Sequence, residues 1–172
     1  MSEYNSHSII LVFAPQAFPE IYVQHGHFLK DVELFDADFF KLSPIEGSIM
    51  DPHQRLLLEC SYTAFANAGC SKDDLLGSDT GVYVGFGVSA ADWPAVMSDR
   101  GLNHSAFASH ASGHAATAGR LSYLLGLKGP CFSIDTACSA SLVAMDVASQ
   151  ALRNGKCSTA VSAGKRHVHM VV

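Results

Sequence analysis

Residues 131–164 read CFSIDTACSASLVAMDVASQALRNGKCSTAVSAG, and this stretch decides the expected fold. Cys131–Thr136 is a short strand-like run, and Ser158–Gly164 is a second one. Between them lies a predicted helix whose apolar residues recur at helical spacing, namely Leu142, Met145, Ala148, Ala151 and Leu152. Asn154-Gly155 closes this helix. A strand, a helix and a strand in this order predict a right-handed βαβ crossover and therefore a parallel sheet.

A second helix is predicted to begin at Asp51-Pro52-His53-Gln54. Asp51 has the side chain of an N-cap, proline suits the first helical position, and Gln54 stands where a capping box needs it. The apolar pattern continues to Gly69, which suits a left-handed stop.

Two more elements precede the βαβ unit. Thr80–Phe86 is β-branched and aromatic, which predicts a buried strand. Ala106–Leu125 predicts a helix that ends at Lys128-Gly129-Pro130. Gly119 lies inside this helix and either weakens it or permits close packing, so a Gly119→Leu change is expected to disturb the packing.

Composition excludes several classes of protein. The 172 residues are 48% hydrophobic and 16% charged, which favours one α/β domain over a disordered chain. The formal charge of −5 makes nucleic acid a poor partner. Five cysteines without a CxxC pair argue against a disulfide framework and predict a reducing compartment, the cytoplasm. The sequence offers no apolar stretch for a membrane span and no readable targeting signal.

Cys138 lies where the strand Cys131–Thr136 ends and the next helix begins. A helix N-terminus carries a partial positive charge and unpaired amides, so it stabilises a thiolate and can hold an oxyanion. Its small neighbours, Ala137, Ser139 and Ala140, leave the thiol open to a substrate. The alternative is a buried cysteine that acts as a small apolar residue, and the turn position alone leaves both interpretations open.

The other cysteines and the histidines have plainer interpretations. Cys60, Cys70, Cys131 and Cys157 are predicted to be structural. His110 and His114 are four residues apart on one predicted helical face and could form a metal pair, although the sequence offers no third ligand. The remaining histidines are predicted to be surface or capping residues, namely His25, His27, His53, His167 and His169.

Several ordered motifs resemble those of one enzyme family. The motifs are His25-Gly26, Phe35-Asp36-Ala37, Met50-Asp51-Pro52 with Gln54-Arg55-Leu56-Leu57-Leu58-Glu59, Thr80-Gly81-Val82-Tyr83-Val84-Gly85, Ala118-Gly119-Arg120-Leu121-Ser122-Tyr123, Gly129-Pro130 and Asp135-Thr136-Ala137-Cys138-Ser139. Together they resemble the N-terminal half of a β-ketoacyl synthase, in particular the ketosynthase domain of modular polyketide synthases. The expected domains are an unmatched segment 1–21, a partial ketosynthase domain 22–164 and a divergent tail 165–172.

The resemblance implies a fold, a reaction and partners. The fold is α/β of the thiolase-like type, layered αβαβα, of which this chain is expected to hold the N-terminal half. Cys138 matches the family's nucleophile, and its own amide matches one oxyanion donor. This cysteine would accept an acyl group from an acyl carrier protein thioester, which then condenses with a decarboxylated malonyl thioester. Substrates would arrive on phosphopantetheine with no tightly bound cofactor and no metal, and a homodimer or a partner chain is expected.

The resemblance also predicts a limit to activity. In the family, decarboxylation and condensation depend on two histidines and a lysine from a C-terminal half, which these 172 residues do not include. None of the chain's own histidines matches them. We therefore expect a fragment, a mispredicted gene product or a degenerate copy that is not competent for condensation.

Three hypotheses follow. The first is a chain-elongating condensing enzyme with Cys138 as the acyl acceptor. The second is a non-catalytic remnant or interaction module, in which Cys138 gains no acyl mass from a thioester. The third is a cysteine-dependent acyltransferase or thioester hydrolase in which a nearby histidine activates Cys138, and it would release free acid.

Overall fold

A computed structural model describes residues 34–86, 92–99, 113–164 and 168–171. The chain divides into two compact units, Met1–Asp31 and Val32–Val172, and every described residue belongs to the second unit. The expected segment 1–21 lies outside the described residues.

A four-stranded sheet of order β2-β1-β3-β4 forms the centre of the described unit. The strands are β1 (Gly81–Phe86), β2 (Cys131–Asp135), β3 (Ala160–Ala163) and β4 (Val168–Val171). Both β2 and β3 run parallel to β1, which confirms the predicted parallel sheet and places β1 between the two strands of the βαβ unit. β4 runs antiparallel to β3 within the tail, where no strand was predicted.

The described helices connect and cover these strands. They are α2 (Pro44–Ile49), α3 (Pro52–Asn67), α4 (Lys72–Leu75), α5 (Asp92–Asp99), α7 (His114–Leu125), the short 3₁₀ helix η1 (Ala137–Ser139) and α8 (Ala140–Arg153). None of the helices in the described ranges has the length and apolar character that a membrane crossing requires.

The N-terminus of α3 follows the sequence prediction in part. The Asp51 side chain accepts a hydrogen bond from His53 N at 2.8 Å, as an N-cap does, and Gly69 adopts a φ of 83° after the helix. Gln54, the expected partner in a capping box, instead directs its Nε2 to Thr117 Oγ1 of α7 at 3.1 Å. The side chain therefore ties α3 to α7.

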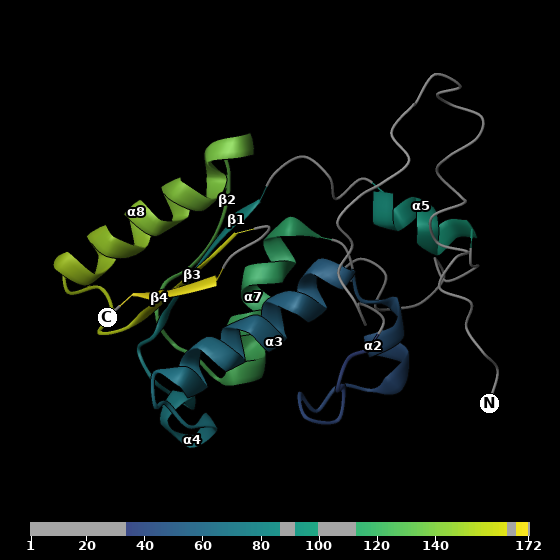
Figure 1. The fold of residues 1–172 in the computed structure, drawn as a ribbon, viewed down its shortest axis with the longest axis horizontal. Coiled ribbons are helices and arrows are strands. Elements are labelled where there is room, and N and C mark those ends of the chain that lie inside the picture. Colours follow the sequence, from purple (N-terminus) through teal and green to yellow (C-terminus); the bar gives the residue numbers. More distant parts are fainter. Residues whose placement is uncertain (1–33, 87–91, 100–112, 165–167, 172) are drawn as a thin grey trace. The chain divides into compact units, whose positions relative to one another are not determined.

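The sheet is covered on both faces, with α8 on one and α3 and α7 on the other (Figure 1). On the α8 face, Tyr83 of β1 packs with alanines of α8. On the opposite face, Val82 and Val161 pack in the larger core with Phe65 of α3 and Leu121 of α7. Alternate residues of β1 thus supply both cores, which explains why nearly all of this strand is buried.

The buried face of α8 differs in part from the predicted one. The residues buried on this helix are Ala140, Ala144 and Ala148, whereas Leu142 is 70% exposed. Of the predicted apolar residues, Ala148 is buried, and Ala151 and Leu152 pack against the same core, so the prediction is confirmed for the second half of α8 and is wrong for Leu142. The helix packs against the sheet through a row of small side chains spaced four residues apart.

The C-terminal end of α7, Leu125, is the predicted one, whereas the N-terminal end differs. Gly113 has an extended backbone and precedes the first helical residue, so the predicted helix does not run through it. Gly126, with a φ of 69°, ends the helix before Lys128-Gly129-Pro130 is reached. A Cβ on the exposed Gly119 would meet nothing within 4 Å, so the expectation that it permits close packing was wrong. Close packing occurs instead at Gly129, against the backbone of Asp79 and Thr80.

These glycines give a first prediction. Gly119→Ala should raise the free energy of unfolding by about 0.5–1 kcal/mol, because alanine is the better helix former and its methyl group enters open space. Gly126→Ala should lower it by about 1–2 kcal/mol, because alanine resists the left-handed backbone. Urea denaturation of the two variants tests both signs. A Gly119→Ala protein less stable than the parent chain contradicts the described surface of α7.

Candidate functional site

Cys138 lies on an exposed turn between β2 and α8. β2 ends at Asp135, and the 3₁₀ helix η1 holds the cysteine before α8 begins at Ala140. Ala137, directly before the cysteine, has a φ of 53°. A residue with a Cβ rarely adopts this left-handed conformation, which costs roughly 1–2 kcal/mol. The structure therefore places Cys138 on a sharp strand-to-helix turn, as the sequence predicted.

Hydrogen bonds from two side chains hold the turn. Ala137 N donates to Asp135 Oδ1 at 3.0 Å. Ser139 Oγ donates to Thr136 O at 2.9 Å and lies 3.0 Å from Thr136 Oγ1. Ser139 occupies the N-cap position of α8, but its hydroxyl bonds backward to the end of the strand and makes no side-chain cap to the helix. The α8 amides nearest Cys138 are therefore not capped by this serine.

Two glycines hold the first turn of α8 against the sheet. A Cβ on Gly85 of β1 would lie 2.5 Å from the carbonyl carbon and oxygen of Ala140 and 2.7 Å from Ser141 N. A Cβ on Gly164, just after β3, would overlap the Ser141 side chain. Only glycine permits this approach of helix backbone to strand. Gly85 and Gly164 thus determine where α8, and with it the turn of Cys138, rests on the ends of two strands.

The remaining cysteines divide into exposed and buried residues. Cys60 and Cys131 are exposed, so their predicted structural role does not come from burial of the thiol. Partial desolvation raises the pKa of the Cys131 thiol, and desolvation together with the charge of Glu59 raises the pKa of Cys60. At neutral pH both thiols therefore form less thiolate than an ordinary cysteine.

Cys157 is buried beside Tyr83. Its Sγ lies 4.0 Å from the Tyr83 hydroxyl, and Gly81 leaves room for both groups. Burial, reinforced by Cys157, raises the pKa of Tyr83 to about 12. Cys157 therefore has the structural setting that the sequence predicted, while Cys70 is partly buried.

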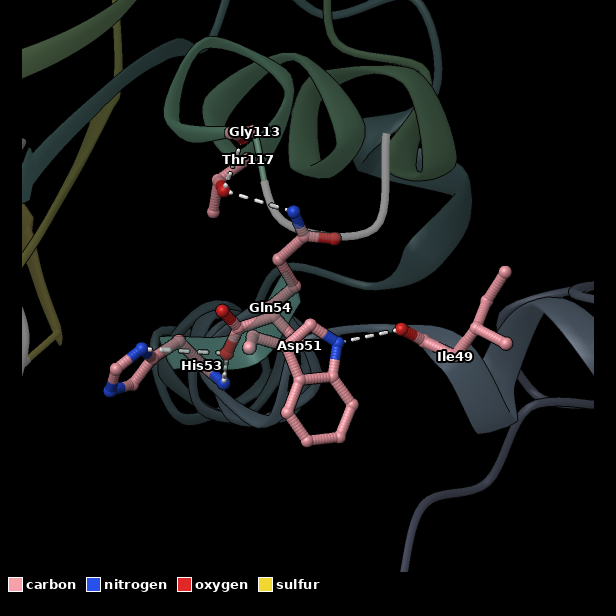
Figure 2. A network of polar contacts seen from close by, with 7 residues as sticks. Ile49, Asp51, His53, Gln54, Gly113 and Thr117 are labelled. Carbon is pink, nitrogen blue, oxygen red and sulfur yellow. Dashed lines mark hydrogen bonds and ion pairs between the residues drawn. The ribbon is translucent and has the colours of Figure 1, made fainter. Parts of the chain in front are cut away.

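Within the described ranges, one histidine side chain is described, that of His53. Its Nδ1 lies 3.4 Å from Asp51 Oδ1 at the start of α3 (Figure 2). The possible metal pair of His110 and His114 lies outside what the structure describes, because His110 and the His114 side chain are not described. Among the described residues, no group of three or more His, Cys, Asp or Glu is arranged to hold a metal ion.

A polar network joins the beginnings of α3 and α7. Figure 2 shows the Gln54 side chain reaching toward Thr117, whose hydroxyl donates to Gly113 O at 3.2 Å. Arg120 of α7 forms a 2.6 Å ion pair with Glu46 of α2, with both side chains largely buried. The two residues are 74 positions apart, and no spacing in the sequence indicates this pair. These contacts brace the helical layer on the face of the sheet opposite α8.

Comparison with known proteins identifies the family. The family described as "Beta-ketoacyl synthase, N-terminal domain" matches residues 11–169. The chain belongs to this β-ketoacyl synthase family. This confirms the resemblance stated from the motifs.

The relatives are polyketide synthases. The polyketide synthase GfsB of Streptomyces halstedii is 43% identical over 150 residues, which cover 87% of this chain and 3% of that protein. A phenolphthiocerol/phthiocerol polyketide synthase of Mycobacterium tuberculosis is 42% identical over 150 residues, covering 87% of this chain and 8% of that protein. The chain thus spans a small part of the curated relatives it matches.

Solved ketosynthases share the fold. The ketosynthase from module 6 of the bacillaene synthase of Bacillus subtilis 168 is 39% identical, with a TM-score of 0.66 over 80% of this chain and 22% of that chain. The oxazolomycin ketosynthase domain of Streptomyces albus JA3453 is 34% identical, with a TM-score of 0.69 over 81% of this chain and 24% of that chain. The predicted α/β, thiolase-like fold class is therefore confirmed over the part that aligns.

The cysteines give a second prediction. In the folded chain at neutral pH, limiting iodoacetamide should alkylate Cys138 first, because it is exposed beside an uncapped helix N-terminus. Cys60 and Cys131 should be labelled more slowly than Cys138. Their labelling rates should increase only at a pH above that of an ordinary cysteine, because their raised pKa values reduce the thiolate fraction at neutral pH. Peptide mass mapping over time measures the order. The assignment is wrong if Cys60 or Cys131 reacts first at neutral pH.

Gly85 gives a third prediction. Gly85→Ala should lower the unfolding free energy by about 1–3 kcal/mol and slow Cys138 alkylation, because the new methyl group meets the α8 backbone, which has to move. Gly119→Ala is the matched control, since it adds the same methyl group in open space. Urea denaturation and alkylation rates measure the two effects. Unchanged stability and reactivity in Gly85→Ala would rule out the close contact with α8.

Proposed function

We propose that this chain provides the acyl-accepting part of a polyketide-type ketosynthase, with Cys138 as the nucleophile. The observation that carries the proposal is the exposed position of Cys138 on a strained turn before an α8 N-terminus without a side-chain cap. Membership of the β-ketoacyl synthase family supports it, because Cys138 stands in the family's Asp-Thr-Ala-Cys-Ser motif.

The proposed step is a transthioesterification. The Cys138 thiolate attacks the carbonyl carbon of an acyl thioester and forms a new carbon–sulfur bond, and the carbonyl oxygen becomes an oxyanion. The intermediate collapses by breaking the bond to the carrier sulfur, which leaves as a thiolate and takes up the proton that Cys138 released. Ser139 N already donates to Thr136 O, and Ala140 N to Ala137 O. The amide of Cys138 itself, which matches an oxyanion donor of the family by resemblance, is the proposed oxyanion donor.

The proposed acyl donor is a phosphopantetheine thioester on an acyl carrier protein. The polyketide synthase relatives support this substrate class. Condensation with a malonyl thioester, and the expectation that the 172 residues alone do not carry it out, stay predictions from the resemblance.

A second copy of the chain is the proposed partner along β2. Within the described sheet β2 is an edge strand that pairs with β1. Four of its five residues are exposed, including Phe132 at 52%. An exposed edge strand with an apolar side chain is a ready site for pairing with another strand. This edge is our candidate for the homodimer contact that the family resemblance implies.

The two alternatives differ in their support. A non-catalytic remnant would leave the exposed, strained turn of Cys138 without a purpose. A hydrolase needs a base beside Cys138, and the histidine side chain that the structure describes, His53, is held by Asp51 at the start of α3. Acyl transfer is the function that the exposed, strained turn of Cys138 supports among the described residues.

The fourth prediction is an acylation test. Incubation with a short acyl phosphopantetheine thioester should add one acyl mass to the chain, retained by Cys60→Ser and lost in Cys138→Ser. Cys60→Ser is the control because it removes another exposed thiol. Intact protein mass spectrometry reads the adduct, and Cys138→Ser should stay folded because the side chain is exposed. No adduct on the folded parent chain supports the remnant, and steady release of free acid supports the hydrolase.

A further inference from the structure

We propose that Asp135 is a positioning residue that presents Cys138 by holding Ala137 in its left-handed conformation. This inference rests on the proposed acyl transfer to Cys138. Asp135 is the last residue of β2 and lies three residues before the nucleophile. Its Oδ1 accepts the Ala137 amide at 3.0 Å, and Ala137 has a φ of 53°.

Both ends of the turn are fixed by the sheet. Asp135 lies in register with Phe86 of β1, so its backbone is anchored to the central strand. Ala140, at the other end, rests against Gly85 of the same strand. The intervening residues 136–139 must reverse the chain direction within this fixed span.

Within the span, the left-handed residue is the strained one. An alanine without support leaves this conformation because its Cβ crowds the following carbonyl oxygen. The Asp135 carboxylate opposes this change of backbone torsion, because its hydrogen bond with Ala137 N would be lost if Ala137 left the left-handed conformation. A hydrogen bond to a charged acceptor is strong enough to offset strain of this size.

The hydroxyl bond from Ser139 to Thr136 supports the same turn from its far side. It does not touch Ala137, whose carbonyl accepts a hydrogen bond from Ala140 N and whose amide is held by the Asp135 side chain. Asp135 acts on Cys138 through the backbone and is not a group that meets the substrate. Its loss should therefore slow the acylation step more than it weakens thioester binding.

The test compares Asp135→Ala with Asp135→Asn, which keeps an Oδ1 acceptor. Asp36→Ala is the matched control, because Asp36 is also exposed and its Oδ1 accepts the Phe39 amide at 2.9 Å in another turn. Asp135→Ala should lower the maximal rate of Cys138 acylation about tenfold, with the half-saturating thioester concentration little changed. Asp36→Ala should stay within about twofold of the parent rate, and Asp135→Asn should fall between the parent and Asp135→Ala, because its neutral Oδ1 still accepts but forms a weaker hydrogen bond.

A double variant separates positioning from general destabilisation. Adding Ala137→Gly to Asp135→Ala should restore most of the rate, because glycine adopts a positive φ without the Cβ penalty. An unchanged rate in Asp135→Ala, an equal loss in Asp36→Ala or a failed rescue each overturns the proposal. If the parent chain is never acylated, the proposed function fails, and iodoacetamide alkylation of Cys138 in the same variants then decides the role of Asp135, because alkylation needs no thioester recognition.

Discussion

The contact between the first turn of α8 and Gly85 is the constraint on which the rest of the site depends. β1 is flanked by β2 and β3, and a Cβ at Gly85 would lie 2.5 Å from the carbonyl atoms of Ala140, too close for the helix to keep its place. Because the helix begins this close to the sheet, the next side chains that face the sheet also have to be small. Ala144 and Ala148 meet that need, and their burial keeps α8 against the strands along its length.

The strain before Cys138 follows from the same contact. Because β2 fixes Asp135 and Gly85 fixes Ala140, the chain has four residues in which to turn from strand to helix. One of them, Ala137, takes a positive φ, and this rotation exposes the next side chain, Cys138. The local energy cost is thus a consequence of how closely helix and sheet pack, and it leaves the thiol accessible at the end of a rigid element.

Local patterns in the sequence predicted the strands β1, β2 and β3 and the helix α3, because short apolar runs indicate the strands and an N-cap residue indicates the start of the helix. They were wrong for Leu142 at the start of α8, because periodicity assigns large apolar residues to the core, whereas this interface buries alanines. β4 was not predicted because the charged Lys165-Arg166-His167 precedes it. The motif located Cys138, but the roles of Gly85 and Asp135 depend on contacts across the sheet or on backbone torsions, which no spacing in the sequence displays.

The two faces of α8 differ in the residues that they present. One face packs its alanines against the sheet, and the other presents Leu142 to solvent near the N-terminal end and the exposed Asp146 and Gln150 further along. A helix at the surface of a domain normally has one apolar face, whereas apolar residues on a second face suit a contact with another layer. The αβαβα arrangement implied by the family has such a contact, because its central helical layer lies between two sheets. Leu142 is therefore the part of the outer face of α8 that suits a second layer, and it lies beside the turn of Cys138, whereas Asp146 and Gln150 keep the rest of that face polar.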